Sequence, residues 1–203
     1  YIVSLLKAND TSNASNLDSE IAIMEEKVGF SLTNEQRNAV ETALNNLISV
    51  ITGGPGTGKS TILNFIRTIY AKQNPKGKIL LLAPTGKAAR RMQETTGCRS
   101  LTIHRGLQLK VDNAGEFGEP IPIDADFILI DEISMLDIFI AEKLFKSIKP
   151  GTKVVLVGDV DQLPSVGAGA VLDDLIDSNI IPLARLTQAK RQAGDSNIIL
   201  NSF

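Results

Sequence analysis

Short apolar runs alternate with segments of helical periodicity along most of the chain. The runs predict buried strands at residues 47–51, 79–83, 127–130, 154–157 and 182–186. Apolar positions spaced three or four residues apart predict helices starting at Thr33 and at residues 60–71, 87–94, 136–148 and 170–176. This alternation indicates an α/β fold, with a parallel sheet and helices on both of its faces. In such sheets ligands bind beyond the carboxyl ends of the strands, where the polar motifs of this chain fall.

Two regions depart from the alternation. Residues 1–30 are uneven, with a helix predicted at 17–28, so we expect an N-terminal helical segment ahead of a main domain at residues 31–203. Residues 107–122 read as a short strand at 108–111, a turn at 112–115 and a return toward Pro122. This pattern favours a small β-hairpin insertion over an irregular loop.

Composition narrows the classes of partner. The 21 basic and 23 acidic residues nearly balance, so any affinity for nucleic acid must come from local patches. A single cysteine, Cys98, excludes an internal disulfide and fits a reducing cytoplasm. No apolar stretch approaches the ~20 residues of a membrane span, so we expect no membrane association. The chain starts at Tyr1 and ends at Phe203 inside an apolar, helix-like run, which indicates a piece of a longer protein.

The most specific motif is the glycine-rich stretch at residues 53–60, called the P-loop below, which directly follows the strand 47–51. A buried strand, a glycine-rich turn and a helix form the context in which this pattern binds phosphate. Backbone N–H groups and the positive helix end would face the β-phosphate, Lys59 would reach the β- and γ-phosphates, and Ser60 would ligate Mg²⁺. The pattern predicts a nucleoside triphosphate site made of Gly54, Pro55, Gly56, Thr57, Gly58, Lys59, Ser60 and Thr61.

Acidic and amide side chains follow two other predicted strands. Asp131 and Glu132 come directly after residues 127–130. There, one carboxylate can hold Mg²⁺ and Glu132 can deprotonate an attacking water, or one acid merely caps the next helix. Gln162 follows the strand 154–157, where its amide suits a sensor of the γ-phosphate; the alternative is an ordinary turn.

Two further residues have both a structural and a functional interpretation. Gln36 stands three residues after Thr33, which is the spacing of a capping box, and its amide could also pair with the edge of adenine. The two roles are compatible. Arg191 follows the last predicted strand, where it is either a surface cation or a contact to the γ-phosphate.

Hydroxyl and basic residues after the strand 79–83 form a candidate site for nucleic-acid backbone. Thr85 and the N–H groups at the next helix start can bind a phosphodiester, with Lys87 and two arginines nearby. A solvated basic helix face explains each cation equally well. Thr102 and His104 offer a second contact, although His104 also suits a structural role. Because only 4% of the residues are aromatic, backbone contacts should dominate over base stacking.

Taken in order, these motifs resemble the RecD-like family of superfamily 1 DNA helicases, the branch that moves 5′ to 3′ and includes the exodeoxyribonuclease V alpha subunit. The resemblance runs from about residue 32 to residue 197. Residues 32–36 resemble the Q motif, 52–60 motif I, 83–89 motif Ia, 102–105 motif Ib, 130–135 motif II, 158–167 motif III, and 191–192 the start of motif IV. An unrelated P-loop protein would not carry these blocks in this order.

The resemblance implies a first RecA-like ATPase domain over residues 31–203, with residues 107–122 as a short strand-separating pin. The implied roles are an adenine contact for Gln36, phosphate and Mg²⁺ binding for Lys59 and Ser60, metal binding for Asp131, activation of water for Glu132, sensing of the γ-phosphate for Gln162 and Arg191, and a single-strand path along Thr85, Thr102 and His104.

The leading hypothesis is therefore the motor domain of an ATP-driven, Mg²⁺-dependent 5′-to-3′ DNA helicase in recombination or repair. Its partners would be single-stranded DNA and, as further candidates, nuclease or helicase subunits. Family helicases carry a second RecA-like domain that supplies an arginine, and this chain ends before it. Because an arginine finger is worth roughly 10³–10⁵ in rate, the chain alone should bind ATP but hydrolyse it feebly and unwind nothing. The alternatives are an ATP-switched DNA-binding or scaffold subunit and a helicase segment of a conjugative relaxase.

Overall fold

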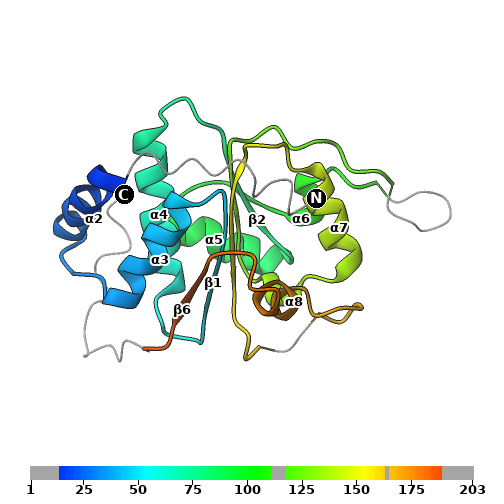
Figure 1. Cartoon of the computed structure of the whole chain (residues 1–203). Helices are drawn as coiled ribbons and strands as arrows, with labels where there is room; N and C mark the ends of the chain where they lie inside the picture. Colours follow the sequence, from blue (N-terminus) through cyan, green and yellow to red (C-terminus); the bar gives the residue numbers. More distant parts are fainter. Residues whose placement is uncertain (1–13, 111–117, 163–164, 189–203) are drawn as a thin grey trace.

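Parallel strands form one twisted sheet at the centre of the molecule (Figure 1). The computed structural model describes residues 14–110, 118–162 and 165–188. Within these residues the strands are β1 (Ile48–Gly53), β2 (Ile79–Ala83), β3 (Ser100–Thr102), β4 (Phe127–Ile130), β5 (Lys153–Gly158) and β6 (Leu183–Leu186). They lie in the order β3-β2-β4-β5-β1-β6, and each pairs in parallel with its neighbours. All the strands therefore end at one edge.

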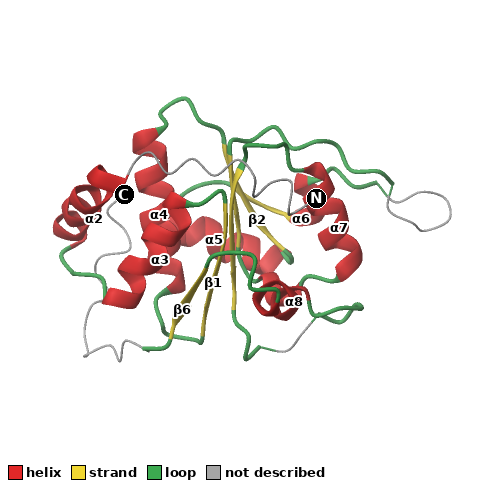
Figure 2. Cartoon of the chain, in the orientation of Figure 1, coloured by secondary structure: helices red, strands yellow, loops and turns green. Residues whose placement is uncertain are grey.

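Helices cover the two faces of this sheet (Figure 2). One face carries α2 (Ala14–Val28), α3 (Asn34–Asn45), α4 (Lys59–Gln73) and α5 (Gly86–Thr96). The other carries α6 (Ile103–Gly106), the 3₁₀ turn η1 (Ile133–Met135), α7 (Ile138–Ser147) and α8 (Val171–Asp177). No helix among the described residues is long and apolar enough to cross a bilayer.

Alternating side chains of the central strands supply two separate cores. In β5, Val154 and Leu156 pack into the core beneath α7 and α8, while Val155 and Val157 pack into the core beneath α3 and α4. Strands buried on both faces read as continuous apolar runs, which is why the sequence pattern located them.

The predicted α/β fold is confirmed, with three local corrections. Strand β3 was not predicted, because a three-residue strand with one large apolar residue gives no periodic signal. The helix predicted at 136–148 begins at Ile138, because Asp137 caps its first turn from an extended backbone conformation; residues 133–135 ahead of it form the 3₁₀ turn η1.

The third correction concerns the predicted hairpin. Residues 108–110 form no strand, because Gln108 has a left-handed φ of 52° and turns the backbone directly after α6. The two segments that flank the predicted turn are still joined, by hydrogen bonds from Gly118 N to Lys110 O (3.0 Å) and from Ile121 N to Leu107 O (3.4 Å). The predicted turn lies at residues 112–115, outside the described residues, so the hairpin itself stays a prediction.

Helix α2 packs onto the main domain. Its Leu17, Ile21 and Met24 belong to the same core as α3 and α4. The predicted boundary at residue 30 between an N-terminal segment and the main domain stays a prediction. Helix α2 nevertheless adds to the core on the face of the sheet that α3 and α4 cover.

Candidate nucleotide and nucleic-acid site

The P-loop joins the end of β1 to the start of α4 and is closely packed. A Cβ at Gly53 would lie 2.7 Å from the Cβ of Leu186, so only glycine lets the loop pass beside β6 at this point. The hydroxyl of Thr57 donates to the carbonyl oxygen of Gly54 across the turn (2.8 Å). Gly58 has a φ of 90° and leads directly into α4, so the first N–H groups of that helix face the loop. This arrangement fits a phosphate group.

Helix α3 braces the P-loop through Gln36. Thr33 and Gln36 form the predicted capping box, with the side-chain oxygen of Gln36 accepting from Thr33 N (3.1 Å). The same amide donates from Nε2 to the carbonyl oxygen of Thr57 (2.9 Å), and Gln36 is buried. The structural role is therefore present, with a second contact to the P-loop that the sequence did not indicate. The adenine contact stays a prediction.

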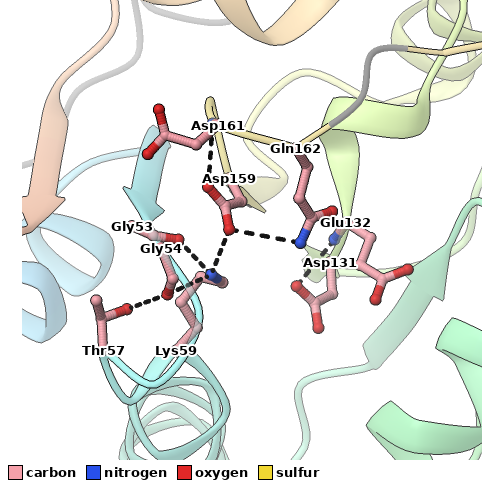
Figure 3. Close-up of polar contacts among 9 residues, drawn as sticks. All are labelled: Gly53, Gly54, Thr57, Lys59, Asp131, Glu132, Asp159, Asp161 and Gln162. Atoms are coloured by element: carbon pink, nitrogen blue, oxygen red, sulfur yellow. Dashed lines mark hydrogen bonds and ion pairs between the residues drawn. The ribbon is translucent and has the colours of Figure 1, made fainter. Parts of the chain in front are cut away.

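The side chain of Lys59 folds back over the first residues of the P-loop. Its Nζ donates to the carbonyl oxygens of Gly53 and Gly54, the latter at 3.0 Å, and lies 3.5 Å from Oδ2 of Asp159 (Figure 3). Its side chain is mostly buried, with 18% exposed. The ammonium is thus held at the carboxyl edge of β1, where the P-loop pattern places a phosphate.

The acidic pair directly follows β4, at the same edge of the sheet as Lys59. Asp131 accepts a hydrogen bond from the N–H of Glu132 (2.8 Å), and burial raises the pKa of its carboxyl group. Lys59 and Arg91 oppose this rise in the pKa of Asp131, which places both cations in its field. Glu132 has a left-handed φ of 55° and makes no side-chain capping bond.

Neither acid caps α7. That role belongs to Asp137, whose Oδ1 accepts from the N–H groups of Phe139 and Ile140 at 2.9 Å each. Glu132 makes no side-chain capping bond to η1 either, so the capping alternative for the two acids is wrong. Both residues remain at the edge of the sheet, with Asp131 on the side of Lys59 (Figure 3). A non-glycine residue at positive φ is uncommon and costs free energy, so Glu132 has the kind of backbone often found at functional sites.

The loop after β5 brings in Gln162 and an unpredicted residue, Asp159. Gln162 lies 3.5 Å from Asp159 through its Nε2, and its N–H donates to the carbonyl oxygen of Asp159 (3.2 Å). The predicted site residue Gln162 therefore lies in the same cluster as Lys59, although it also forms part of a turn. Asp159 is buried, and a polar residue directly after an apolar strand was the signal that could have identified it.

The residues predicted to contact DNA lie at or just after the carboxyl ends of the neighbouring strands β2 and β3. Thr85 caps α5 by accepting from Ala88 N (3.1 Å), and Thr102 caps α6 by accepting from Arg105 N (3.3 Å). Because Ala83 pairs with Thr102, both helix starts lie at the same edge as the P-loop. Lys87 is exposed and His104 is partly buried, on α5 and α6 respectively.

The residues that directly follow β6 are bound to Glu35 on α3. Arg191 lies outside the described residues. Three residues before it, Gln188 N donates to Glu35 (3.2 Å), and Thr187 donates to the same carboxylate through its N–H (2.7 Å) and hydroxyl (2.5 Å). The Thr187 hydroxyl bond is the main reason that the pKa of Glu35 is lowered. Glu35 precedes Gln36, so one turn of α3 contacts both the P-loop and the chain that leaves β6.

The side chains present fit a magnesium–nucleotide group rather than a protein-made metal cage. Within the described residues, no cluster of three or more His, Cys, Asp or Glu side chains could hold a metal by itself. Mg²⁺ at phosphate sites commonly takes only one or two protein ligands, with waters and phosphate oxygens supplying the rest. Ser60, at the start of α4, and Asp131, after β4, are the residues that would hold it.

Comparisons with known proteins agree with this geometry. A family model described as an AAA domain matches residues 36–168. The RecBCD enzyme subunit RecD of Mycolicibacterium smegmatis is 39% identical over 166 residues, covering 70% of this chain and 30% of that protein. The ATP-dependent RecD2 DNA helicase of Deinococcus radiodurans is 38% identical over 174 residues, covering 83% of this chain and 23% of that protein. The chain thus spans less than a third of these relatives.

Solved structures extend the comparison to the fold. The Pif1 helicase from Candida albicans has a TM-score of 0.56 and 28% identity, with 81% of this chain and 41% of that chain covered. Bacteroides sp Pif1 in complex with ADP-AlF4 has a TM-score of 0.53 and 22% identity, with 79% and 43% covered, and supports the fold alone. The chain therefore belongs to the AAA domain family and, as its motifs indicated, is RecD-like, of the superfamily 1 helicase type.

Proposed function

We propose that this chain is the first RecA-like motor domain of an ATP-driven DNA helicase that moves 5′ to 3′ along single-stranded DNA in recombination or repair. The observation that carries the proposal is that two groups of residues lie at the same edge of the sheet. Lys59, Asp131, Glu132 and Gln162 gather at the ends of β1, β4 and β5, and the helix starts at Thr85 and Thr102 lie at the ends of the adjoining β2 and β3. A nucleotide site and a nucleic-acid site on one edge would allow nucleotide turnover to move the DNA contacts.

The nucleotide side of the proposal assigns a task to each side chain. The N–H groups of the P-loop and the Lys59 ammonium bind and orient the β- and γ-phosphates of ATP. Mg²⁺, held by Ser60 and Asp131, would supply positive charge to neutralise the phosphate oxygens. Glu132 takes a proton from the attacking water, and Gln162 orients that water or the γ-phosphate. The adenine contact of Gln36 and the γ-phosphate contact of Arg191 belong to the same proposal.

The nucleic-acid side is proposed to bind backbone rather than bases. The α5 start at Thr85 presents N–H groups to a phosphodiester, with Lys87 exposed two residues later in the first turn of the helix. Thr102 and His104 extend the path along β3 and α6. The relatives are named as a subunit of RecBCD and as RecD2, so a complex with nuclease or helicase subunits and a protein that works alone both fit the proposal.

Rates of ATP hydrolysis by the full-length protein, with and without single-stranded DNA, test this function. We expect DNA to stimulate hydrolysis and Glu132→Gln to lower kcat at least about 100-fold, since general-base catalysis contributes roughly 10²–10⁴. ATP binding should survive in that variant, which separates loss of chemistry from loss of the site. Duplexes with 5′ or 3′ tails then test direction. Equal unwinding of both duplexes, or hydrolysis unaffected by Glu132→Gln, would contradict the proposal.

A further inference from the structure

Asp159 is a buried carboxylate in the middle of the site, and no motif assigned it a role. The residue is 1% exposed and directly follows β5. Its Oδ1 accepts from Asp161 N (3.1 Å), while Oδ2 lies 3.5 Å from Lys59 Nζ and 3.5 Å from Gln162 Nε2. Figure 3 shows it between the lysine and the glutamine. A buried charge must be compensated, and among the described residues Lys59 provides its ion pair.

We propose that Asp159 is the counter-ion of Lys59 and a positioning residue that couples Lys59 to Gln162. One oxygen, Oδ2, faces both the ammonium and the amide, so these two groups share a single acceptor. The other Lys59 contacts, to the carbonyl oxygens of Gly53 and Gly54, are to neutral groups. The negative charge of Asp159 therefore opposes any phosphate that attracts the ammonium.

This competition links the position of Lys59 to that of Gln162. When the ammonium moves toward a phosphate, Oδ2 loses part of its compensation and draws more strongly on the Gln162 amide. Gln162 lies on the loop that leaves β5, and its N–H already bonds to the Asp159 carbonyl, so the loop is tied to Asp159 at two points. A displacement of the Lys59 ammonium is in this way transmitted to the loop after β5.

Removing the charge of Asp159 separates this role from simple packing. The inference rests on the proposed triphosphate site, and Asp159→Asn keeps the shape of the side chain. We expect the 203-residue chain carrying Asp159→Asn to bind ATP and ADP about tenfold more tightly, because a phosphate no longer competes with a carboxylate for Lys59. In the full-length protein, KM should fall while kcat also falls, at least about tenfold. The single oxygen of asparagine stays with the Asp161 N–H, so its amide nitrogen faces Gln162, which loses its acceptor. A packing defect would instead weaken binding.

Asp161→Asn is the matched control, since it makes the same change two residues away on an exposed side chain. Its affinity for ATP should stay within about twofold of the unsubstituted chain. Unchanged or weaker ATP binding by Asp159→Asn would overturn the counter-ion role. Tighter binding with unchanged kcat would overturn the coupling to Gln162. If circular dichroism shows that Asp159→Asn does not fold, Asp159→Ser also removes the charge and carries the same expectations.

Lys59→Met distinguishes failure of the inference from failure of the proposed function. If Lys59→Met leaves ATP binding intact, the phosphate role of Lys59 is wrong and the proposed site fails. If it abolishes binding while Asp159→Asn gives no gain, only the inference fails.

Discussion

Replacing Gly58 with alanine tests the contact that joins helix α3 to the P-loop. Gly58 has a φ of 90°, a left-handed value that an L-residue adopts only at a cost. A Cβ at this position would lie 2.5 Å from Nε2 of Gln36. The Gln36 amide cannot easily move aside, because it is buried and hydrogen-bonded at both ends, to Thr33 N and to Thr57 O. Alanine at position 58 therefore strains the backbone and displaces a buried amide.

Two terms set the expected size of the effect. Left-handed backbone at a non-glycine residue costs about 1–2 kcal/mol. Loss of the buried bond between Gln36 and Thr57 costs about 1–3 kcal/mol, because the groups left behind are not solvated. The free energy of unfolding should fall by about 2–5 kcal/mol, and Tm by roughly 5 to 20 °C for a chain of this length.

Thermal and urea unfolding followed by circular dichroism measure this change, and neighbouring glycines supply the controls. Gly54→Ala has neither positive φ nor a close contact, so its effect should stay within about 0.5–1 kcal/mol. Gly56→Ala, with a φ of 78° and nothing within 4 Å, should show the backbone term alone. In a Gln36→Ala background Gly58→Ala should cost no more than Gly56→Ala. Equal losses at positions 56 and 58 in the unsubstituted chain, or strict additivity with Gln36→Ala, would refute the proposed clash.

Two further predictions concern single side chains away from the P-loop. Lys153 donates to the carbonyl oxygens of Leu44 (2.7 Å) and Asn46 (2.6 Å) at the end of α3, and burial lowers its pKa from 10.5 to about 8. Between these two pH values the unfolded chain binds a proton that the folded chain lacks, so the free energy of unfolding relative to Lys153→Met should rise from pH 8 to pH 10. The rise should be about 1–2 kcal/mol after allowing for partial solvent exposure. A difference in urea midpoints that stays constant with pH would contradict this. Asp137→Ala should lower the free energy of unfolding by about 1–2 kcal/mol through loss of the α7 cap, whereas Asp137→Ser, which keeps a capping oxygen, should lose much less; equal losses would assign the effect to something other than the cap.

Local motifs could be predicted from sequence because their chemistry is contained in a few adjacent residues. The P-loop needs a strand, a glycine turn and a helix, and Thr33 with Gln36 needs only one helical turn. Asp159 could not be assigned in the same way, since its role depends on Lys59, which is a hundred positions away and becomes a neighbour only through the pairing of β1 with β5. Burial of Lys153 likewise depends on where α3 ends against β5.

The order of the strands explains how the two halves of the site are connected. Because β5 lies between β1 and β4, residues from three distant stretches, Lys59, Asp131 and Asp159, meet around one space. Strand β4 also pairs with β2, and the Asp131 N–H donates to the carbonyl oxygen of Leu82 (3.0 Å), two residues before the Pro84 that precedes Thr85. The side chain of Asp131 thus lies in the proposed nucleotide site, while its backbone N–H is bonded to β2, the strand that leads to the proposed DNA site. A shift of the acidic pair would therefore reach the start of α5 across a single strand pairing, whereas a shift at Gln162 must first pass through β4.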